Sequence, residues 1–134
     1  SFNLKNIIDE RLIFTGYIKN QEILSELYNN CYVYIHGHEF GGTNPTMIKA
    51  LACSSAILAL DTVFNKEMLN NGEFGMFFKK NIDSIKEMIV YCEKNDIIVK
   101  KFRDKSTKAV SKKYNWDYIA RQYSSVFYNL LNGK

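Results

Sequence analysis

The sequence predicts an α/β protein with a parallel sheet covered by helices on both faces. Short apolar runs flanked by polar residues alternate with segments in which apolar residues recur every three or four positions, the pattern of strands joined by helices. The run 56–60 (Ala-Ile-Leu-Ala-Leu) is apolar throughout, as expected of a strand buried on both faces of a parallel sheet. With 134 residues, the chain is long enough for one such domain and too short for two.

The elements follow from these patterns. Strands are predicted at 12–15, 32–36, 56–60 and 75–78. Helices are predicted from the cap Asn20 to Cys31, and at 45–53, 65–69, 82–92, 96–113 and after the cap Asn115. A single helical turn containing Leu4, Ile7 and Ile8 is expected within 2–9.

The last helix has an apolar stripe that predicts an inward face. Its members recur at helical spacing: Ile119, Tyr123, Val126, Phe127 and Leu130. Trp116, at the start of this helix, is predicted to anchor packing. The lysine-rich stretch 100–113 is interpreted mainly as a solvated helix face, with contact to a membrane surface or an acidic partner as the alternative.

Composition excludes few functions. The net charge of +4 fits a site for anionic substrates as well as it fits nucleic-acid binding, and we expect no nucleic-acid partner. No apolar run approaches the length of a membrane span and no signal peptide is recognisable, so we expect a cytoplasmic protein. Cys31, Cys53 and Cys92 lie in apolar stretches and are predicted to be buried, reduced thiols.

The loop 37–44 is the strongest candidate for a binding site. It follows a predicted strand and precedes a helix that begins at Pro45, with Asn44 as the cap. Gly41 and Gly42 allow the backbone to approach a ligand closely. Unpaired N–H groups and the positive end of the helix dipole favour an anion here, most often a phosphate. Ligands bind at the carboxyl ends of parallel strands, where this loop is expected to lie.

His36 and His38 raise the question of a metal site, since neighbours two apart in an extended chain can share an ion. No third ligand stands out nearby, so we expect no metal. His36 is interpreted as a packed residue at the strand end, and His38 as a hydrogen-bond donor to a sugar or phosphate.

Beyond these patterns, the chain from Leu12 onward resembles the C-terminal, donor-binding half of group 1 glycosyltransferases of the GT-B fold. The segment Leu12-Ile-Phe-Thr-Gly-Tyr-Ile resembles the family's strand that leads to the nucleotide base region. The segment His36-Gly-His-Glu-Phe-Gly-Gly-Thr-Asn-Pro resembles the glycine-rich donor loop of the rhamnosyltransferase-like branch. Further similar segments are Ala50-Leu-Ala-Cys, Asp61-Thr-Val-Phe-Asn-Lys-Glu-Met-Leu and Tyr114-Asn-Trp-Asp-Tyr-Ile-Ala.

The resemblance implies a Rossmann-like domain, over residues 1–134, that binds a nucleotide-diphosphate sugar and needs no other cofactor. The sugar would pass, with retention, to an acceptor hydroxyl in the synthesis of a surface polysaccharide or glycoconjugate. The acceptor, a sugar or lipid-linked glycan, would bind to an N-terminal domain absent from this chain, as is the family's first strand–helix unit. The enzyme would work in the cytoplasm, at the inner face of the membrane where its acceptor is lipid-linked, and the 134 residues alone would be inactive.

The resemblance also assigns roles to residues of this sequence. Diphosphate contacts are implied for Gly41, Gly42, Thr43 and Asn44, catalytic contacts for Glu39 and His38, and nucleotide contacts for Tyr17, Ile18 and Lys49. The family's pattern has two carboxylates, and these positions fall on Gly41 and Lys49. A lysine cannot accept hydrogen bonds from ribose hydroxyls as the second carboxylate does. The alternative function is therefore a non-catalytic nucleotide-sugar, phosphate-binding or assembly module.

Overall fold

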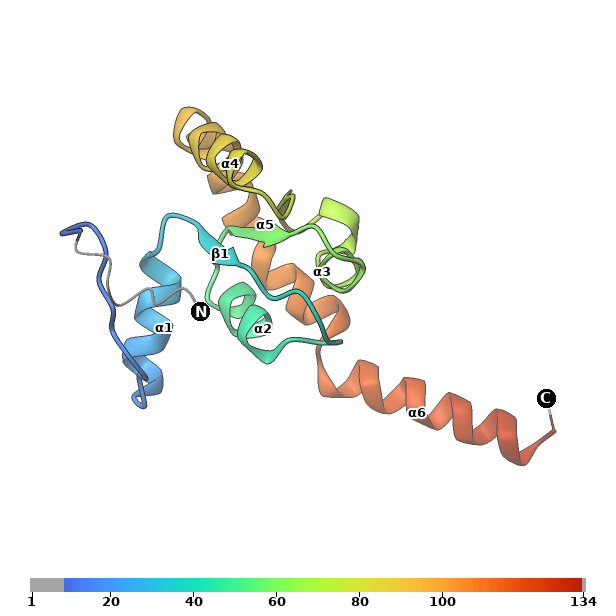
Figure 1. Cartoon of the computed structure of the whole chain (residues 1–134). Coiled ribbons are helices and arrows are strands. Elements are labelled where there is room, and N and C mark those ends of the chain that lie inside the picture. Colours follow the sequence, from blue (N-terminus) through green and yellow to red (C-terminus); the bar gives the residue numbers. More distant parts are fainter. Residues whose placement is uncertain (1–8, 134) are drawn as a thin grey trace.

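A three-stranded parallel sheet forms the centre of the structure, a computed structural model that describes residues 9–133 (Figure 1). Its strands are β1 (Tyr34–His36), β2 (Ile57–Leu60) and β3 (Met76–Phe78), in the order β1-β2-β3. Tyr34 pairs with Ile57, and Leu58 with Met76, both in parallel register. The predicted α/β class with a parallel sheet is confirmed.

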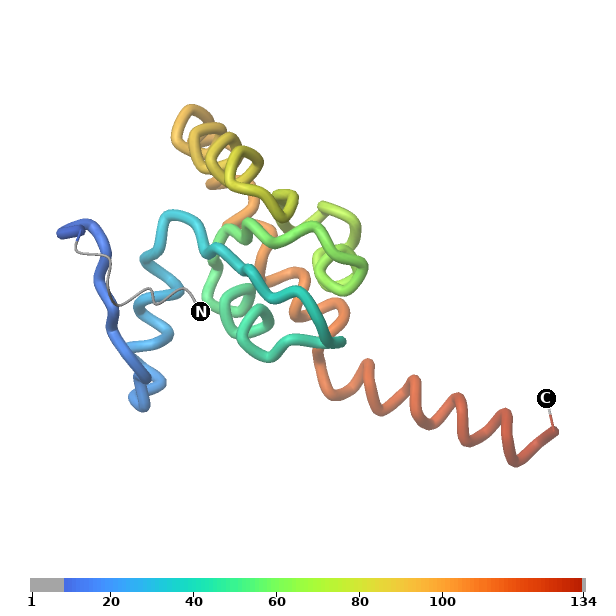
Figure 2. The backbone as a smooth tube through the Cα atoms, in the orientation of Figure 1, coloured from blue at the N-terminus to red at the C-terminus, as the bar shows by residue number. Residues whose placement is uncertain are grey.

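Helices alternate with these strands along the chain, as the path of the tube in Figure 2 shows. They are α1 (Gln21–Asn30), α2 (Pro45–Ala52), α3 (Val63–Met68), the 3₁₀ turn η2 (Asn70–Gly72), α4 (Ile82–Lys94), α5 (Asp96–Lys113) and α6 (Trp116–Leu131). Asn20, Asn44 and Asn115 each accept hydrogen bonds from first-turn N–H groups, which confirms the three predicted caps.

The core has two halves because successive residues of a strand point to opposite faces of the sheet. Ile57 and Ala59 pack on one face with α2, α3 and the second half of α5. Leu58 and Leu60 pack on the other with α4 and the first half of α5. All four residues of β2 are buried, as predicted for a strand covered on both sides.

The predicted strand at 12–15 is wrong. In the structure this segment has no strand partner, and Leu12, Ile13 and Phe14 are exposed. Within residues 9–133, the sheet ends at β1, which pairs with β2 alone, so no neighbouring strand receives these residues. The described sheet accordingly has three strands instead of the four predicted. The helical turn expected around Leu4, Ile7 and Ile8 lies outside the described residues.

The predicted inward face of the last helix is also wrong. Figure 1 shows α6 extending away from the sheet, and four of its five stripe residues are exposed, with Ile119 half-buried. Trp116 is 84% exposed and anchors no packing among the described residues. The helical spacing was predicted correctly, but beyond Ile119 no part of the described chain covers the stripe.

Smaller differences concern boundaries and the cysteines. The strand predicted at 32–36 begins at Tyr34, and the short helix predicted at 65–69 begins at Val63. All three cysteines are free, but only Cys92 is buried, whereas Cys31 and Cys53 are half-buried. Within residues 9–133, no helix has the length and apolar character needed to cross a bilayer.

Candidate functional site

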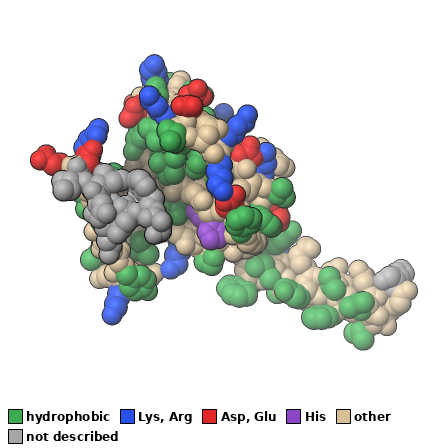
Figure 3. Space-filling model, in the orientation of Figure 1, with side chains coloured by type: hydrophobic (Ala, Val, Ile, Leu, Met, Phe, Trp, Pro, Cys, Tyr) green, Lys and Arg blue, Asp and Glu red, His purple; other side chains and the backbone are tan. Residues whose placement is uncertain are grey.

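Three loops meet at the carboxyl edge of the sheet, because all three strands run in the same direction. They are 37–44 after β1, 61–62 after β2 and 79–81 after β3. Figure 3 shows histidine side chains on the face at this edge, with acidic and basic side chains close by. The predicted loop 37–44 therefore lies where a parallel sheet offers room for a ligand.

The backbone N–H groups of Gly41, Gly42 and Thr43 form the open part of this loop. Within residues 9–133, none of them donates to a protein acceptor, and all three residues are exposed. Gly41 has φ +110°, a conformation that a side chain rarely tolerates. A Cβ on Gly42 would meet no atom within 4 Å, so space lies above the backbone. The segment can donate several hydrogen bonds to one anion.

Asn44 organises the start of α2. Its Oδ1 accepts from the N–H groups of Thr46 (2.9 Å) and Met47 (3.3 Å). Its own N–H points to Met68 Sδ at 3.2 Å. Three N–H groups at the helix start are thus satisfied by the protein, and the donors left for a ligand are those of residues 41–43.

Asn65, a residue that sequence reasoning missed, ties the loop to β2. This α3 side chain is buried, and its Nδ2 donates to the carbonyls of His38 (3.0 Å) and Leu60 (2.9 Å). Thr62 caps α3 through the N–H of Asn65 at 3.1 Å. A fixed loop backbone is what a ligand site built from N–H groups needs. The sequence did hold a signal, because asparagine is unfavourable inside a helix and its presence in α3 indicates a role for the side chain.

His36 lies buried at the end of β1, as predicted. Tyr34, two residues earlier on the face covered by α2, places its hydroxyl 3.3 Å from His36 Nδ1. His36 is 4% exposed, and its Nε2 has no hydrogen-bond partner among the described residues. Burial, and secondarily the nearby His38, lowers the pKa of His36, so its ring is neutral near pH 7. His38 is exposed, its ring centroid 5.9 Å from that of His36.

Glu39 forms an ion pair that spans the site. Its Oε2 lies 2.5 Å from Nζ of Lys80, which follows β3. The pair joins the loops after β1 and β3 across the end of β2. Lys80 was not identified from the sequence, because two lysines after a predicted strand do not indicate a functional residue. It brings a positive charge to the edge where the open N–H groups lie.

The three residues predicted for nucleotide contact lie on the α1 side of the loop. Lys49 Nζ donates to Gln21 Oε1 at 3.0 Å, which links α2 to the first turn of α1. Tyr17, which is 86% exposed, and the half-buried Ile18 precede that turn. The structure thus places Lys49 and the Tyr17–Ile18 segment on the same side of the site.

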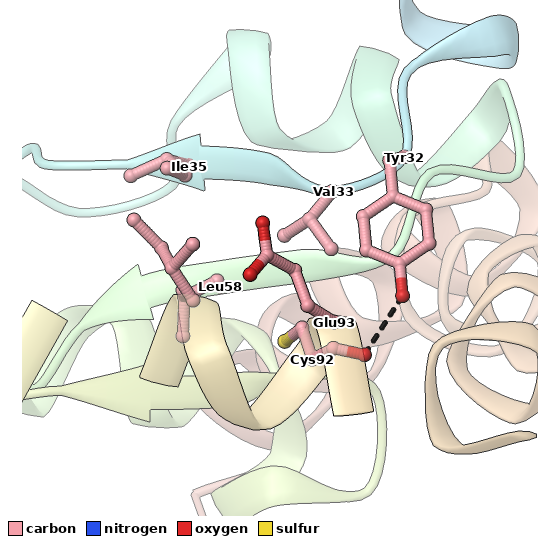
Figure 4. A pocket seen from close by; sticks show the side chains of 7 residues that line it. Tyr32, Val33, Ile35, Leu58, Cys92 and Glu93 are labelled. Atoms are coloured by element: carbon pink, nitrogen blue, oxygen red, sulfur yellow. Dashed lines mark hydrogen bonds between the residues drawn. The ribbon is translucent and has the colours of Figure 1, made fainter. Parts of the chain in front are cut away.

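A separate cavity of about 190 Å³ lies between β1 and α4 (Figure 4). Val33, Ile35, Leu58 and Cys92 contribute to its mainly apolar lining, and Tyr32 bonds the Cys92 carbonyl at 2.7 Å. A second bond, to Asp96 at 2.6 Å, raises the pKa of Tyr32 to about 12. The cavity is small for a ligand pocket and has few polar groups to orient a ligand. No cluster of metal-ligating side chains occurs among residues 9–133.

Comparison with known proteins decides the family. The model for glycosyl transferases group 1 matches residues 3–122, most of the chain. The chain belongs to this family. It is also similar to an uncharacterised glycosyltransferase of Methanocaldococcus jannaschii, with 23% identity over 129 residues. That alignment covers 95% of this chain and 33% of the relative, so the chain spans about a third of the relative's length.

Proposed function

We propose that this glycosyltransferase domain binds the nucleotide-diphosphate sugar donor through the loop 37–44. The observation that carries the proposal is the set of open N–H groups at residues 41–43, ahead of a capped helix at the carboxyl edge of the sheet. Such donors stabilise the negative charge that develops on a departing diphosphate.

In the proposed reaction, the bond between the anomeric carbon and the diphosphate oxygen breaks, and an acceptor hydroxyl forms the new bond with retention. The proton of the acceptor hydroxyl would pass to the departing phosphate oxygen, and the nucleoside diphosphate leaves. N–H groups, and Lys80 nearby, would balance the phosphate charge without a metal. Glu39 would contact sugar hydroxyls or stabilise positive charge at the anomeric carbon, and His38 would donate a hydrogen bond to sugar or phosphate.

Lys49 and the Tyr17–Ile18 segment would contact the nucleotide, given their position on the α1 side of the loop. Asn44 would contribute to the diphosphate site by fixing the start of α2, since its amide oxygen already caps that helix.

The domain would be part of a GT-B enzyme of the rhamnosyltransferase-like branch. One feature supports a further strand beside β1: within residues 9–133, only one edge of β1 is paired, with β2. The exposed run Leu12–Phe14 would pair with the far side of that strand. The acceptor, a sugar or lipid-linked glycan, would bind to another domain, and the enzyme would act in the cytoplasm at the inner face of the membrane.

Calorimetry with uridine, guanosine and thymidine diphosphates tests the proposal on the protein at its full encoded length. We expect one of them to bind, and Gly42→Asp to weaken binding at least about tenfold by placing a carboxylate beside the phosphates. Asn132→Asp, which adds the same charge at an exposed position far along the chain, is the control. Heat from none of the three diphosphates, or equal binding by both variants, would contradict a diphosphate site in this loop.

A non-catalytic binding module is the second candidate, and the lysine at position 49 favours it. The Lys49 ammonium is engaged by Gln21 and offers no acceptor for ribose hydroxyls. Donor turnover by the full-length protein separates the candidates. Binding without turnover, combined with tighter binding by Lys49→Glu, would support the module over the enzyme.

A further inference from the structure

Positive charge is concentrated on α5. The whole chain has 18 basic and 14 acidic residues, a net charge of +4. The 18 residues of α5 contain two acidic side chains, Asp96 and Asp104, against seven basic ones: Lys100, Lys101, Arg103, Lys105, Lys108, Lys112 and Lys113. This helix therefore carries a net +5 and the remaining residues a net −1. The excess positive charge of the protein is located on one helix.

Three of the seven basic side chains already have partners. Arg103 points toward α1 and donates to the carbonyls of Cys31, at 2.6 Å, and Asn29. Lys112 and Lys113 lie 3.4 and 3.5 Å from carboxylates of Glu73 and Glu67. These three side chains therefore hold α5 to other parts of the structure.

The other four lysines, at positions 100, 101, 105 and 108, have no carboxylate within 4.0 Å in the part of the chain that the structure describes. Asp104, although four residues after Lys100, forms no ion pair with it. Lys105 is close enough to Glu73 to help lower the pKa of that carboxyl, but none of the four is held in an ion pair with a described residue, and their charges are available to an external partner.

Three of these lysines form a row with an exposed apolar residue. Val99, Ser106 and Ala109 are the buried residues of α5. At 100° per residue, Ile97, Lys101, Lys105 and Lys108 lie together on another side of the helix, a row of about 17 Å, with the carboxylate of Asp104 at the margin of the same side. Ile97 is 82% exposed. We call these four residues the α5 basic face.

We propose that the α5 basic face docks on the headgroups of an anionic phospholipid bilayer, with Ile97 inserting among them. Lysines on flexible stems without fixed partners suit a diffuse layer of phosphates, and each adds to the attraction. An isoleucine adds apolar contact at the bilayer boundary.

Other polyanions fit this face less well. It carries no aromatic ring on which bases could stack and no arginine for bidentate reading of bases. The proposal rests on the proposed function only in that a lipid-linked acceptor would be reached at the same membrane.

Vesicle flotation of the full-length protein tests the proposal. We expect binding to phosphatidylglycerol vesicles, little binding to phosphatidylcholine vesicles, and release by salt. Replacing the three lysines of the face (K101Q/K105Q/K108Q) should weaken binding by roughly 100-fold, given about fivefold per lysine.

A control with the same change of charge at exposed positions on α4 and α6 (K86Q/K94Q/R121Q) should bind nearly as wild type. Circular dichroism checks that both variants fold. No binding by the wild type, equal losses in both variants, or tighter binding to polyuridine RNA or polyglutamate than to vesicles would overturn the proposal. Diphosphate calorimetry on the same variants separates the outcomes: lost vesicle binding with intact diphosphate binding leaves the proposed function standing, and the reverse leaves membrane docking standing.

Discussion

The carboxyl edge of the sheet and the two ends of the described chain differ in how far their apolar side chains are buried. Around α2, local signals and tertiary packing agree: Asn44 caps the helix, and Met47, Ala50 and Leu51 are fully buried. At 12–15 and along α6, apolar residues at regular spacing remain exposed. The comparison teaches that residue pattern sets the type of an element, whereas burial depends on a partner that must be present.

Core truncation should show the largest difference between these regions. Leu51→Ala removes a fully buried side chain beside β2 and should reduce the free energy of unfolding by about 2–5 kcal/mol. Leu130→Ala, in the exposed stripe of α6, should change it by less than about 0.5 kcal/mol in the 134-residue chain. Urea denaturation measures both.

Measuring Leu51→Ala and Leu130→Ala in the full-length protein sharpens the comparison. If another domain covers α6, Leu130→Ala becomes destabilising there, while the Leu51→Ala effect stays the same. Equal, small effects of Leu130→Ala in both contexts would show that the stripe has no partner in the same protein.

Removing the cap of α2 should have the next largest effect. Asn44→Ala frees the N–H groups of Thr46 and Met47, and should cost about 1 kcal/mol of stability. Because the same residue fixes the end of the loop, diphosphate affinity should fall as well. Asn20→Ala, which removes the equivalent cap of α1, is the control for stability alone. Calorimetry showing the same diphosphate affinity in both variants would contradict a role of the α2 start in binding.

His36→Leu should have a smaller effect on the free energy of unfolding near neutral pH. It removes a buried ring whose Nε2 has no partner among residues 9–133, but it also deprives the Tyr34 hydroxyl of its contact with Nδ1, so the two effects should largely offset each other. Burial lowers the pKa of His36 in the folded state below its ordinary value of 6.5. At pH values below about 6.5 the unfolded state therefore binds more protons than the folded state. Wild-type stability should therefore fall as pH drops below about 6.5, and His36→Leu should reduce this fall. Thermal melts between neutral and mildly acidic pH measure both effects, and an unchanged pH dependence would contradict the assignment.

The sequence predicted the parts of the site that depend on local geometry. Pro45 and Asn44 marked the helix start, the apolar run 56–60 marked a strand buried on both faces, and His36 was expected at a strand end. Asn65 and Lys80 were not predicted because each contacts a residue of the loop 37–44 that is distant in the sequence, by 27 and 41 residues respectively. The strand at 12–15 failed for a related reason: an extended apolar run becomes a strand only beside another strand.

The Lys80–Glu39 pair connects the loops after β1 and β3, and its loss should have only a small effect on the free energy of unfolding. Both side chains are partly exposed, so Lys80→Met should change the free energy of unfolding by no more than about 1 kcal/mol. Its effect on binding should be larger than its effect on folding, because the positive charge lies at the edge where the diphosphate is proposed to bind. We expect weaker diphosphate binding and a reduced salt dependence of that binding, whereas Lys79→Met, one residue earlier and outside the pair, should preserve both. Equal diphosphate affinity in Lys80→Met and Lys79→Met would show that the pair only tethers two loops, and the charge balance of the proposed site would then rest on its backbone N–H groups.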